Sequence, residues 1–567
     1  MGDRRTEALW RPPMLLDRLV TRILKLPSAP APYRVDRGLR VPMSDGVELA
    51  AAHYAPQGEP AGTILVRGPY GLGAPFDLLY ARPYAARGYH VLFVASRGTA
   101  ASGGDFDPMR TELADGRDVV AWMVAQPWFT GRFATVGPSY LGFTQWALLM
   151  DPPPEMAAAV VTVGPHDFAK HSWGTGAMNL DLVGWSDMMN RQPRGDRSPG
   201  LVRGQLKQAV AAPRQARALR PVFTDLPLAD AGERHYAGGA RWFRDRVTRP
   251  DIDGDAYWEP MRFAAALEKA EIPILLHSGW QDLFLAQTFE QYQRLSARGL
   301  DVALTVGPWT HRGVIQDGGS RLIPETLDWL GAKLAGRPLA RRTPVHLRVT
   351  GTDEWRELDE WPPPCTPLVL FPRPGAALGD APAGSEAGFT FDPARPTPAF
   401  GGPLLENGGY VDDGGLAARP DVLAFTGEPL AAAVEVHGVP EVELAHRSDN
   451  PHVDLFVRVS EVDPAGRSRN VCEGYRRLDP ARDQSTLVRI PLMPVAHRFA
   501  AGSRIRLLIA GGCYPQFTRN LGTAENPGTG TTLVPARHRL TLGPSRLVLP
   551  TAAPVSPPPA SPAPGAG

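Results

Sequence analysis

Short, uninterrupted runs of apolar residues recur through roughly the first 340 positions of the chain. They occur at residues 63–66, 91–94, 133–136, 157–163, 273–277 and 302–306. Runs of this length are typical of strands that are buried on both faces of a parallel sheet. The segments at 112–128, 285–295 and 327–334 instead have the length and apolar spacing of helices. This alternation predicts βαβ units and therefore an α/β domain.

Three departures from this alternation suggest how the chain is divided. An Asp-Gly turn at residues 45–46 joins two short strand-like segments, which predicts a hairpin before the α/β units. Between about 165 and 270, aromatic, methionine and arginine residues mix without strand periodicity, which favours a mostly helical insertion. Beyond residue 341, short strands alternate with Pro/Gly turns, as in a β-sandwich or jelly roll.

These patterns predict an α/β domain with a mostly helical insertion, followed by an all-β sandwich or jelly-roll domain. The N-terminal arm and the Pro/Ala-rich end of the chain fall outside these domains, and we expect that end to be disordered. The predicted segments are an arm at 1–35, the α/β domain at 36–164 and 271–340, the cap at 165–270, the jelly roll at 341–550 and the tail at 551–567.

The composition narrows the function classes. The 567 residues include 60 basic and 59 acidic side chains, a net charge of +1, which gives no general electrostatic case for binding nucleic acid or an anionic membrane. No apolar stretch is long enough to span a membrane. The three cysteines, Cys365, Cys472 and Cys513, have neither disulfide-framework nor metal-ligand spacing. We therefore expect reduced thiols, a cytoplasmic protein and no metal site.

The segment Gly-Pro-Ser-Tyr-Leu-Gly at residues 137–142 is the first candidate for chemistry. It lies between the apolar run 133–136 and a helix-like run at 143–150. A serine at a sharp strand-to-helix turn is the context of a nucleophile elbow, in which Ser139 would be exposed above the sheet. The second glycine, Gly142, comes one position later than in the usual motif. By itself the motif fits an ordinary strand–helix turn equally well.

A serine nucleophile needs a base and a carboxylate that orients the base. Asp282 follows the strand-like run 273–277, and His311 follows the run 302–306, so both are expected in loops at the carboxyl ends of strands. The order Ser139, Asp282, His311 is that of α/β-hydrolases. Taken singly, Asp282 could cap the next helix and His311 could be a surface histidine.

An oxyanion hole usually needs two donors. The first candidate is the backbone N–H of Tyr140, the residue after the nucleophile. The loop after residues 63–66 contains Pro69, which cannot donate, and lacks repeated glycines, so the hydroxyl of Tyr70 is the second candidate. A ring that simply packs under the loop is the alternative interpretation for Tyr70.

Together these segments resemble the cocaine esterase/X-Pro dipeptidyl-peptidase family of serine hydrolases, the CocE/NonD type. The resemblance implies an α/β-hydrolase domain, a helical cap and a C-terminal jelly roll. It also implies a triad of Ser139, Asp282 and His311, with Tyr70 in the oxyanion hole and no metal or organic cofactor. The matching segments are residues 67–70, 97–106, 115–118, 126–128, 137–142, 279–282, 307–311, 454–457, 499–506 and 514–520.

The substrate is less defined than the reaction. We expect a small ester or amide, or a short peptide, and prefer an esterase/amidase to an Xaa-Pro dipeptidyl-peptidase. A dipeptidase would need a cap carboxylate for the free amino terminus, for which Asp181, Asp187 and Glu233 are candidates. The aromatic cap residues that could line an acyl pocket, or equally form ordinary cap core, are Phe168, Trp173 and Trp185.

Two other functions use the same sequence features. A non-catalytic protein would bind a partner through the jelly roll and would lack a reactive serine. A transferase would pass the acyl group to an alcohol instead of water, using the same residues. The architecture is also compatible with a homodimer.

Overall fold

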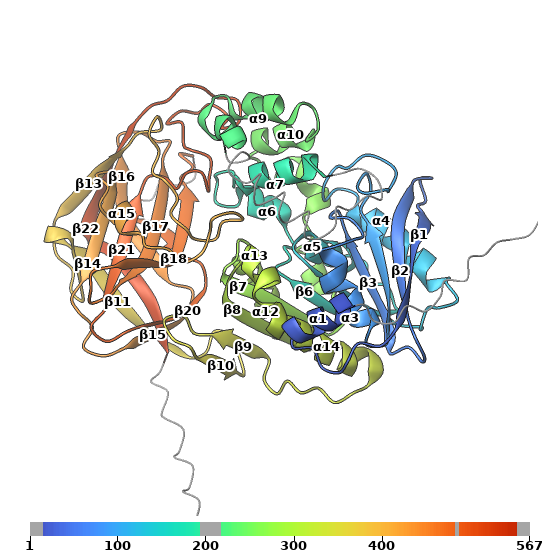
Figure 1. The fold of residues 1–567 in the computed structure, drawn as a ribbon. Coiled ribbons are helices and arrows are strands. Elements are labelled where there is room, and N and C mark those ends of the chain that lie inside the picture. The colour runs from blue at the N-terminus through green and yellow to red at the C-terminus, as the bar shows by residue number, and fades with distance from the viewer. Residues whose placement is uncertain (1–14, 193–216, 482–486, 553–567) are drawn as a thin grey trace, which may run out of the picture.

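The computed structural model describes residues 15–192, 217–481 and 487–552. Residues 1–14 of the predicted arm and nearly all of the predicted tail lie outside these residues. Figure 1 shows two β-rich bodies side by side, with the cap helices above the region between them.

The helices up to the cap are α1 (Leu15–Ile23), α2 (Phe76–Tyr80), α3 (Arg82–Ala85), α4 (Glu112–Val124) and α5 (Tyr140–Leu148). The cap contains α6 (Phe168–Trp173), α7 (Asp181–Asn190), α9 (Leu228–Tyr236), α10 (Trp242–Thr248), η1 (Ala256–Met261) and α11 (Ala266–Lys269). The later helices are α12 (Leu285–Ala297), α13 (His311–Gln316), α14 (Gly319–Ala335), η2 (Pro374–Ala376) and α15 (Gly414–Ala417).

The first sheet has ten strands in the order β1-β2-β4-β3-β5-β6-β7-β8-β9-β10. Strands β3 to β9 run parallel to their neighbours, whereas β1, β2 and β10 pair antiparallel at the two edges. The strands are β1 (Tyr33–Pro42), β2 (Glu48–Pro56), β3 (Gly62–Gly68), β4 (Tyr89–Ala95), β5 (Phe133–Pro138), β6 (Met156–Thr162), β7 (Ile274–Gln281), β8 (Val302–Thr310), β9 (Val345–Arg348) and β10 (Trp355–Leu358).

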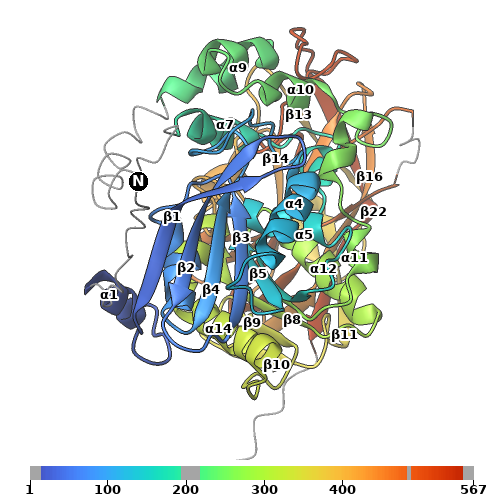
Figure 2. The same ribbon diagram turned by 90° about the vertical axis from the view of Figure 1, so that its right-hand side faces the viewer.

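Helices cover both faces of this sheet, which explains the continuous apolar runs in the sequence. In β7, Ile274 and Leu276 pack into the core that contains α4, α5 and α12. Leu275, between them, packs into the opposite core with residues of α3 and α14. Because successive strand residues point to opposite faces, both faces must be apolar when both are covered. Figure 2 shows α4 and α5 in front of the strands.

The boundary predicted at residue 341 separates two strands from the sheet to which they belong. Residues 345–349 are predicted to lie in the all-β domain, but β9 pairs parallel with β8, with Val345 opposite Leu304. The first sheet therefore continues through β10, which ends at Leu358. A four-residue strand that alternates apolar and polar residues has the same local signature in either sheet, and its partner is decided only by tertiary pairing.

The C-terminal part is all-β apart from η2 and α15. Its strands follow the path β18-β17-β21-β14-β12-β11-β22-β15-β20, with β13, β16 and β19 attached through β22 and β16. Its core is a separate apolar cluster. The strands are β11 (Cys365–Arg373), β12 (Ala377–Gly379), β13 (Glu386–Phe391), β14 (Val422–Gly427), β15 (Val434–Gly438), β16 (Glu441–Ser448), β17 (Asp454–Val462), β18 (Ser468–Arg477), β19 (Leu487–Pro491), β20 (Val495–Phe499), β21 (Arg504–Ala510) and β22 (Ala536–Ala552).

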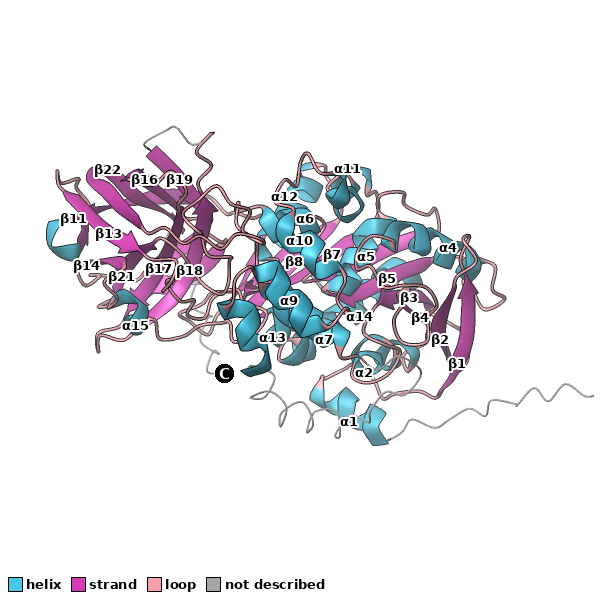
Figure 3. Cartoon of the chain, turned by 90° about the horizontal axis from the view of Figure 1, so that it is seen from above, coloured by secondary structure: helices cyan, strands magenta, loops and turns pink. Residues whose placement is uncertain are grey.

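The helical insertion predicted after residue 165 lies between β6 and β7 and bridges the two bodies (Figure 3). Its contacts with the all-β part include hydrogen bonds from the Leu180 N–H to the Gln516 carbonyl and from the Ala229 N–H to the Gly528 carbonyl, 2.8 and 2.9 Å long. Within the described ranges, no helix is long and apolar enough to cross a membrane.

Candidate active site

The strand order of the first sheet places the candidate residues together. The chain runs from β3 outward to β4 and then returns to β5 on the other side of β3. The carboxyl ends of β3 and β5 therefore flank a topological switch point, where open α/β sheets bind their ligands. Tyr70 follows β3 and Ser139 follows β5, while Asp282 and His311 follow β7 and β8 at the same edge.

Ser139 adopts a backbone conformation that side chains normally avoid. Its φ of 56° and ψ of −120° lie between the end of β5 and the start of α5. Such strain persists only where surrounding packing enforces it, and it is common at functional sites. The Ser139 N–H donates to the Thr162 carbonyl at 2.8 Å. The structure therefore has the sharp strand–serine–helix turn expected from the sequence.

The late glycine of the motif has a packing role. A Cβ atom on Gly142 would lie 2.6 Å from the Gly164 Cα atom, and one on Gly137 would lie 2.4 Å from the Leu141 Cβ atom. Real Cβ atoms do not approach other atoms so closely. Helix α5 thus begins against neighbouring backbone, and this contact accounts for glycine at position 142 instead of 141.

Ser139, His311 and Asp282 form one hydrogen-bonded chain. The Nε2 atom of His311 lies 3.0 Å from the Ser139 hydroxyl oxygen, and its Nδ1 atom lies 2.6 Å from Oδ1 of Asp282. The carboxylate is fully buried. In this order a histidine can take the serine proton while the carboxylate stabilises the resulting imidazolium.

Asp282 also accepts hydrogen bonds at the start of the next helix, so a capping role and a role beside His311 do not exclude each other. Its Oδ2 atom accepts hydrogen bonds from the Ser278 hydroxyl at 3.1 Å and from the Phe284 N–H at 3.2 Å, just before α12. These bonds fix the carboxylate while Oδ1 faces His311. His311 is not a loop residue as predicted but the first residue of α13, where Thr310 caps the helix through the Gly313 N–H.

Tyr70 faces the nucleophile with its hydroxyl. The indole N–H of Trp185 donates to the Tyr70 oxygen at 3.2 Å. Burial raises the pKa of Tyr70, and hydrogen bonds with Trp185 and Ser139 oppose that rise. Because an indole N–H can only donate, the Tyr70 proton is left to point elsewhere, including toward an oxyanion formed next to Ser139.

Tyr140 directs its side chain away from this site. Its hydroxyl donates to Glu112 at 2.9 Å and accepts from the Met109 N–H at 2.7 Å. Its backbone N–H is the first of helix α5, where N–H groups have no partner within the helix. The two neighbouring tyrosines therefore offer different donors, the hydroxyl of Tyr70 and the backbone of Tyr140.

Comparison with known proteins agrees with this arrangement. Residues 45–313 match the model of the X-Pro dipeptidyl-peptidase (S15) family, and residues 340–548 match the model of the X-Pro dipeptidyl-peptidase C-terminal non-catalytic domain. The chain is a serine hydrolase of the CocE/S15 type. It is accordingly an enzyme that acts on ester or amide bonds, so the non-catalytic alternative is excluded.

Two relatives illustrate how far the likeness extends. The cocaine esterase of Rhodococcus sp. (strain MB1 Bresler) is 28% identical, over 91% of this chain and 98% of that protein. An α-amino acid ester hydrolase structure superposes with a TM-score of 0.77 at 22% identity, covering 93% of this chain and 98% of the other. The second comparison supports the fold, an α/β-hydrolase-like part followed by an all-β domain.

The structure separates the three aromatic residues expected to line the hydrolase's pocket. Trp185 lies at the site, where it contacts Tyr70 and stacks on Tyr140 with ring centroids 6.2 Å apart. Phe168 and Trp173 instead surround Arg246 in the cap: the guanidinium lies 4.9 Å from the Phe168 ring, and the Trp173 N–H donates to the Arg246 carbonyl.

Sequence reasoning missed two aromatic residues beside the reacting groups. Phe284 packs edge-on against His311, 5.4 Å between ring centroids. Phe106 lies 6.3 Å from both Trp185 and Tyr140. The position of Phe284, two residues after the candidate carboxylate, was a usable signal. Phe106 ends the glycine-rich loop at 97–106, and nothing in the sequence showed that this loop reaches the cap.

The three cap carboxylates also differ. Asp187 pairs with His235 and Arg191 at 2.8 and 2.9 Å, and Glu233 pairs with Arg244. Asp181 accepts the Leu405 N–H at 3.0 Å through Oδ1, whereas its buried Oδ2 atom has no hydrogen-bond partner among the described residues. Burial raises the pKa of Asp181 to about 6, and His311 is close enough to oppose that rise.

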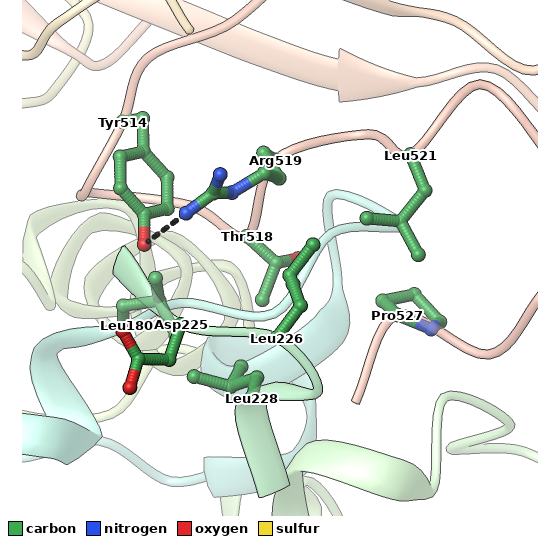
Figure 4. Close-up of a pocket in the computed structure, with 9 residues that line it drawn as sticks. All are labelled: Leu180, Asp225, Leu226, Leu228, Tyr514, Thr518, Arg519, Leu521 and Pro527. Carbon is green, nitrogen blue, oxygen red and sulfur yellow. Dashed lines mark hydrogen bonds between the residues drawn. The ribbon is translucent and has the colours of Figure 1, made fainter. Parts of the chain in front are cut away.

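Two hollows lie between the cap and the all-β domain, away from the triad. The smaller has a volume of about 10 Å³, room for roughly one water molecule, and is lined by residues that include Leu180, Asp225 and Arg519 (Figure 4). The larger is a groove of about 1200 Å³ whose lining includes His171 and Trp173. Neither lining contains Ser139, Asp282 or His311.

The described parts of the chain contain no group of three or more His, Cys, Asp or Glu side chains arranged to hold a metal ion. The cysteines Cys365, Cys472 and Cys513 are unpaired thiols.

Proposed function

We propose that Ser139, His311 and Asp282 are the catalytic triad of a carboxylic ester hydrolase that also accepts amides. Ser139 attacks the substrate carbonyl while His311 takes its proton and Asp282 stabilises the imidazolium. The leaving group departs with that proton, and water activated by His311 releases the acyl group. The observation that carries this proposal is the continuous hydrogen-bonded chain from Ser139 through His311 to Asp282.

The oxyanion of the tetrahedral intermediate is stabilised by the Tyr70 hydroxyl and the Tyr140 N–H. Trp185 supports this role because its indole N–H donates to the Tyr70 oxygen, so the Tyr70 proton is left to point toward the oxyanion. His171 is held neutral, since burial and the nearby His311 lower its pKa to about 3. No competing cation therefore arises from His171 when His311 becomes charged.

The substrate we favour is an ester with an apolar acyl group. The relative named cocaine esterase acts on an ester. Around the triad, Trp185, Phe106 and Phe284 supply aromatic surface from the cap, the loop after β4 and the start of α12. Such surface suits an apolar group next to the reacting carbonyl.

A fluorophosphonate probe tests the nucleophile. We expect wild-type protein and a Ser296→Ala control, changed at an exposed serine of α12, to be labelled. Ser139→Ala should be neither labelled nor active. Labelling of Ser139→Ala, or an unlabelled wild type, would contradict the proposed nucleophile. Adding an alcohol to the esterase assay then distinguishes hydrolysis from acyl transfer through the products formed.

An Xaa-Pro dipeptidyl-peptidase is the second candidate, and Asp181 is the observation that favours it. Its unpartnered Oδ2 atom is buried one helical turn from Trp185, so it could accept a hydrogen bond from a substrate amino group. Rates on aryl esters and Xaa-Pro anilides, measured in parallel, decide between the two. If the peptidase assignment holds, Asp181→Asn raises KM for the anilide but not for the ester, while the exposed control Glu233→Gln changes neither.

Three further expectations are also proposals. We propose a jelly-roll topology for the all-β domain, supported by its buried apolar core and mainly antiparallel strands. A cytoplasmic location is supported by the three reduced cysteines. The expected partner is the small substrate, without cofactor, nucleic acid or membrane, and light scattering tests whether the chain forms a homodimer.

A further inference from the structure

A buried cluster of polar side chains lies directly behind the proposed oxyanion hole. The carboxylate of Glu112 accepts from Arg67 at 2.8 Å, from Ser96 at 3.0 Å and from the Tyr140 hydroxyl at 2.9 Å. Arg67 also donates twice to the Glu112 carbonyl, at 3.1 and 3.2 Å. The exposed fractions of Arg67, Glu112 and Tyr140 are 4, 2 and 2%. The ion pair is therefore almost completely removed from water.

The cluster joins the elements that carry the two oxyanion donors. Arg67 lies at the end of β3, three residues before Tyr70. Tyr140 is the first residue of α5 and provides the other donor through its backbone. Glu112, the first residue of α4, lies between them and contacts both. The loop with one donor and the helix with the other are thus tied to a single carboxylate.

Packing around the cluster leaves little freedom for either donor. A Cβ atom on Gly68 would lie 2.3 Å from Leu141 Cδ1, so the end of β3 touches the first turn of α5. The Thr144 hydroxyl, also on α5, lies 3.3 Å from the Arg67 carbonyl oxygen. A displacement of Glu112 would therefore change the distance between the donors as well as the position of each.

We propose that Glu112 is a positioning residue for hydrolysis, because it holds the Tyr70 loop and the Tyr140 backbone at the separation that the oxyanion requires. Glu112 does not touch the substrate. Buried ion pairs contribute little to stability relative to apolar residues of the same volume. The positioning of the two oxyanion donors gives a functional reason for burying the Arg67–Glu112 ion pair here. The inference rests on the proposed oxyanion roles of Tyr70 and Tyr140.

Two variants test this connection, one at Tyr140 and one at Glu112. Tyr140→Phe removes only the hydroxyl and leaves the backbone donor and the Arg67–Glu112 pair in place. Glu112→Gln keeps the side-chain shape and removes the charge. The matched control is Tyr475→Phe, since the Tyr475 hydroxyl donates to the buried carboxylate of Asp454, which also pairs with Arg477, but in the all-β domain. All three variants are compared with wild type by thermal unfolding and by kinetics on one aryl ester.

The measurement that separates positioning from stability is the affinity for phenylboronic acid, which forms a tetrahedral anionic adduct with a reactive serine. We expect kcat to fall about 10-fold in Tyr140→Phe and about 100-fold in Glu112→Gln, the scale on which misplaced catalytic groups lose rate. The Kd for phenylboronic acid should rise by the same factors, with KM changed less than about 2-fold, because the adduct resembles the transition state and the ester does not.

The control should lose thermal stability but neither kcat nor boronate affinity. The inference fails if both folded active-site variants keep wild-type kcat and boronate affinity, or if Tyr475→Phe loses as much of either. A wild-type protein that binds no boronate and resists fluorophosphonate removes the proposed function, and this inference with it. If both variants bind phenylboronic acid as tightly as the wild type does, the inference about Glu112 fails while the proposed function stands.

Discussion

Two buried tyrosine–carboxylate–arginine clusters occupy different parts of this hydrolase. Behind Ser139, Glu112 binds Arg67 and the Tyr140 hydroxyl. In the all-β domain, Asp454 binds Arg477 through two hydrogen bonds of 2.8 and 2.9 Å and accepts the Tyr475 hydroxyl. The chemistry of the two clusters is nearly the same, and both carboxylates are buried.

The clusters differ in what they connect. Asp454 and Arg477 already face each other as register partners of β17 and β18, so backbone hydrogen bonds hold that pair together without the side chains. Arg67, Glu112 and Tyr140 lie on a strand and two helices that share no strand ladder with one another. Around Glu112, side-chain contacts join these three elements. The comparison teaches that the same ion pair reinforces structure in one place and sets the geometry of a site in another.

The largest expected contrast between the two regions comes from exchanging one buried aspartate in each. Asp282→Asn should lower kcat about 10,000-fold, because the amide no longer fixes the His311 tautomer or stabilises its charged form. Asp454→Asn should leave kcat within about 2-fold, since that carboxylate holds no catalytic group. Steady-state kinetics on an aryl ester measures both. Equal losses of kcat in the two variants would show that the two regions do not differ in their effect on catalysis.

The next effect concerns the oxyanion hole alone. Tyr70→Phe removes one proposed donor and should lower kcat roughly 100- to 1000-fold, with KM little changed. Fluorophosphonate labelling should continue more slowly, because Ser139 and His311 remain paired. A Tyr70→Phe enzyme with normal kcat would shift the donor role to another group and weaken the functional contrast between the clusters.

A moderate effect on stability is expected in the all-β domain. Asp454→Asn leaves the partly buried Arg477 charge without its carboxylate partner, which should cost about 3 kcal/mol of unfolding free energy. Denaturant unfolding followed by far-UV circular dichroism gives the value, with exposed Asp353→Asn as the control. An unchanged unfolding free energy would indicate that the β17–β18 ladder makes this ion pair dispensable.

The smallest effect is a pH dependence of stability at Asp181. Its pKa is raised to about 6 by burial, above the value of an unfolded aspartate near 3.8. Its contribution to stability is therefore fully present below about pH 4 and is lost as the pH rises through 6. Asp181→Asn should raise Tm at pH 7.5 relative to wild type, and the difference should shrink toward pH 4. A difference that is independent of pH would contradict the raised pKa.

Much of the α/β part could be predicted from the sequence because its signals are local. Continuous apolar runs follow from a sheet covered on both faces, and the runs at 133–136 and 302–306 became β5 and β8. The order of Ser139, Asp282 and His311 after successive strands suggested a common edge, and the structure brings the three side chains into hydrogen-bonding contact. Strand ends were less predictable, since β7 and β8 each continue four residues beyond the apolar run.

The strand runs, the sharp turn at Ser139 and the order of the reacting groups could be predicted from local patterns. Tertiary packing was needed to settle which sheet β9 joins, which cap aromatic approaches Tyr70, and that Glu112 meets Tyr140. These two groups of features depend on interactions of different range along the chain. Periodicity and turn chemistry act over a few residues, whereas the Glu112 contacts join residues 45 and 28 positions away in the chain. Such pairs are brought together by the packing of the whole domain, and no local sequence pattern predicts them.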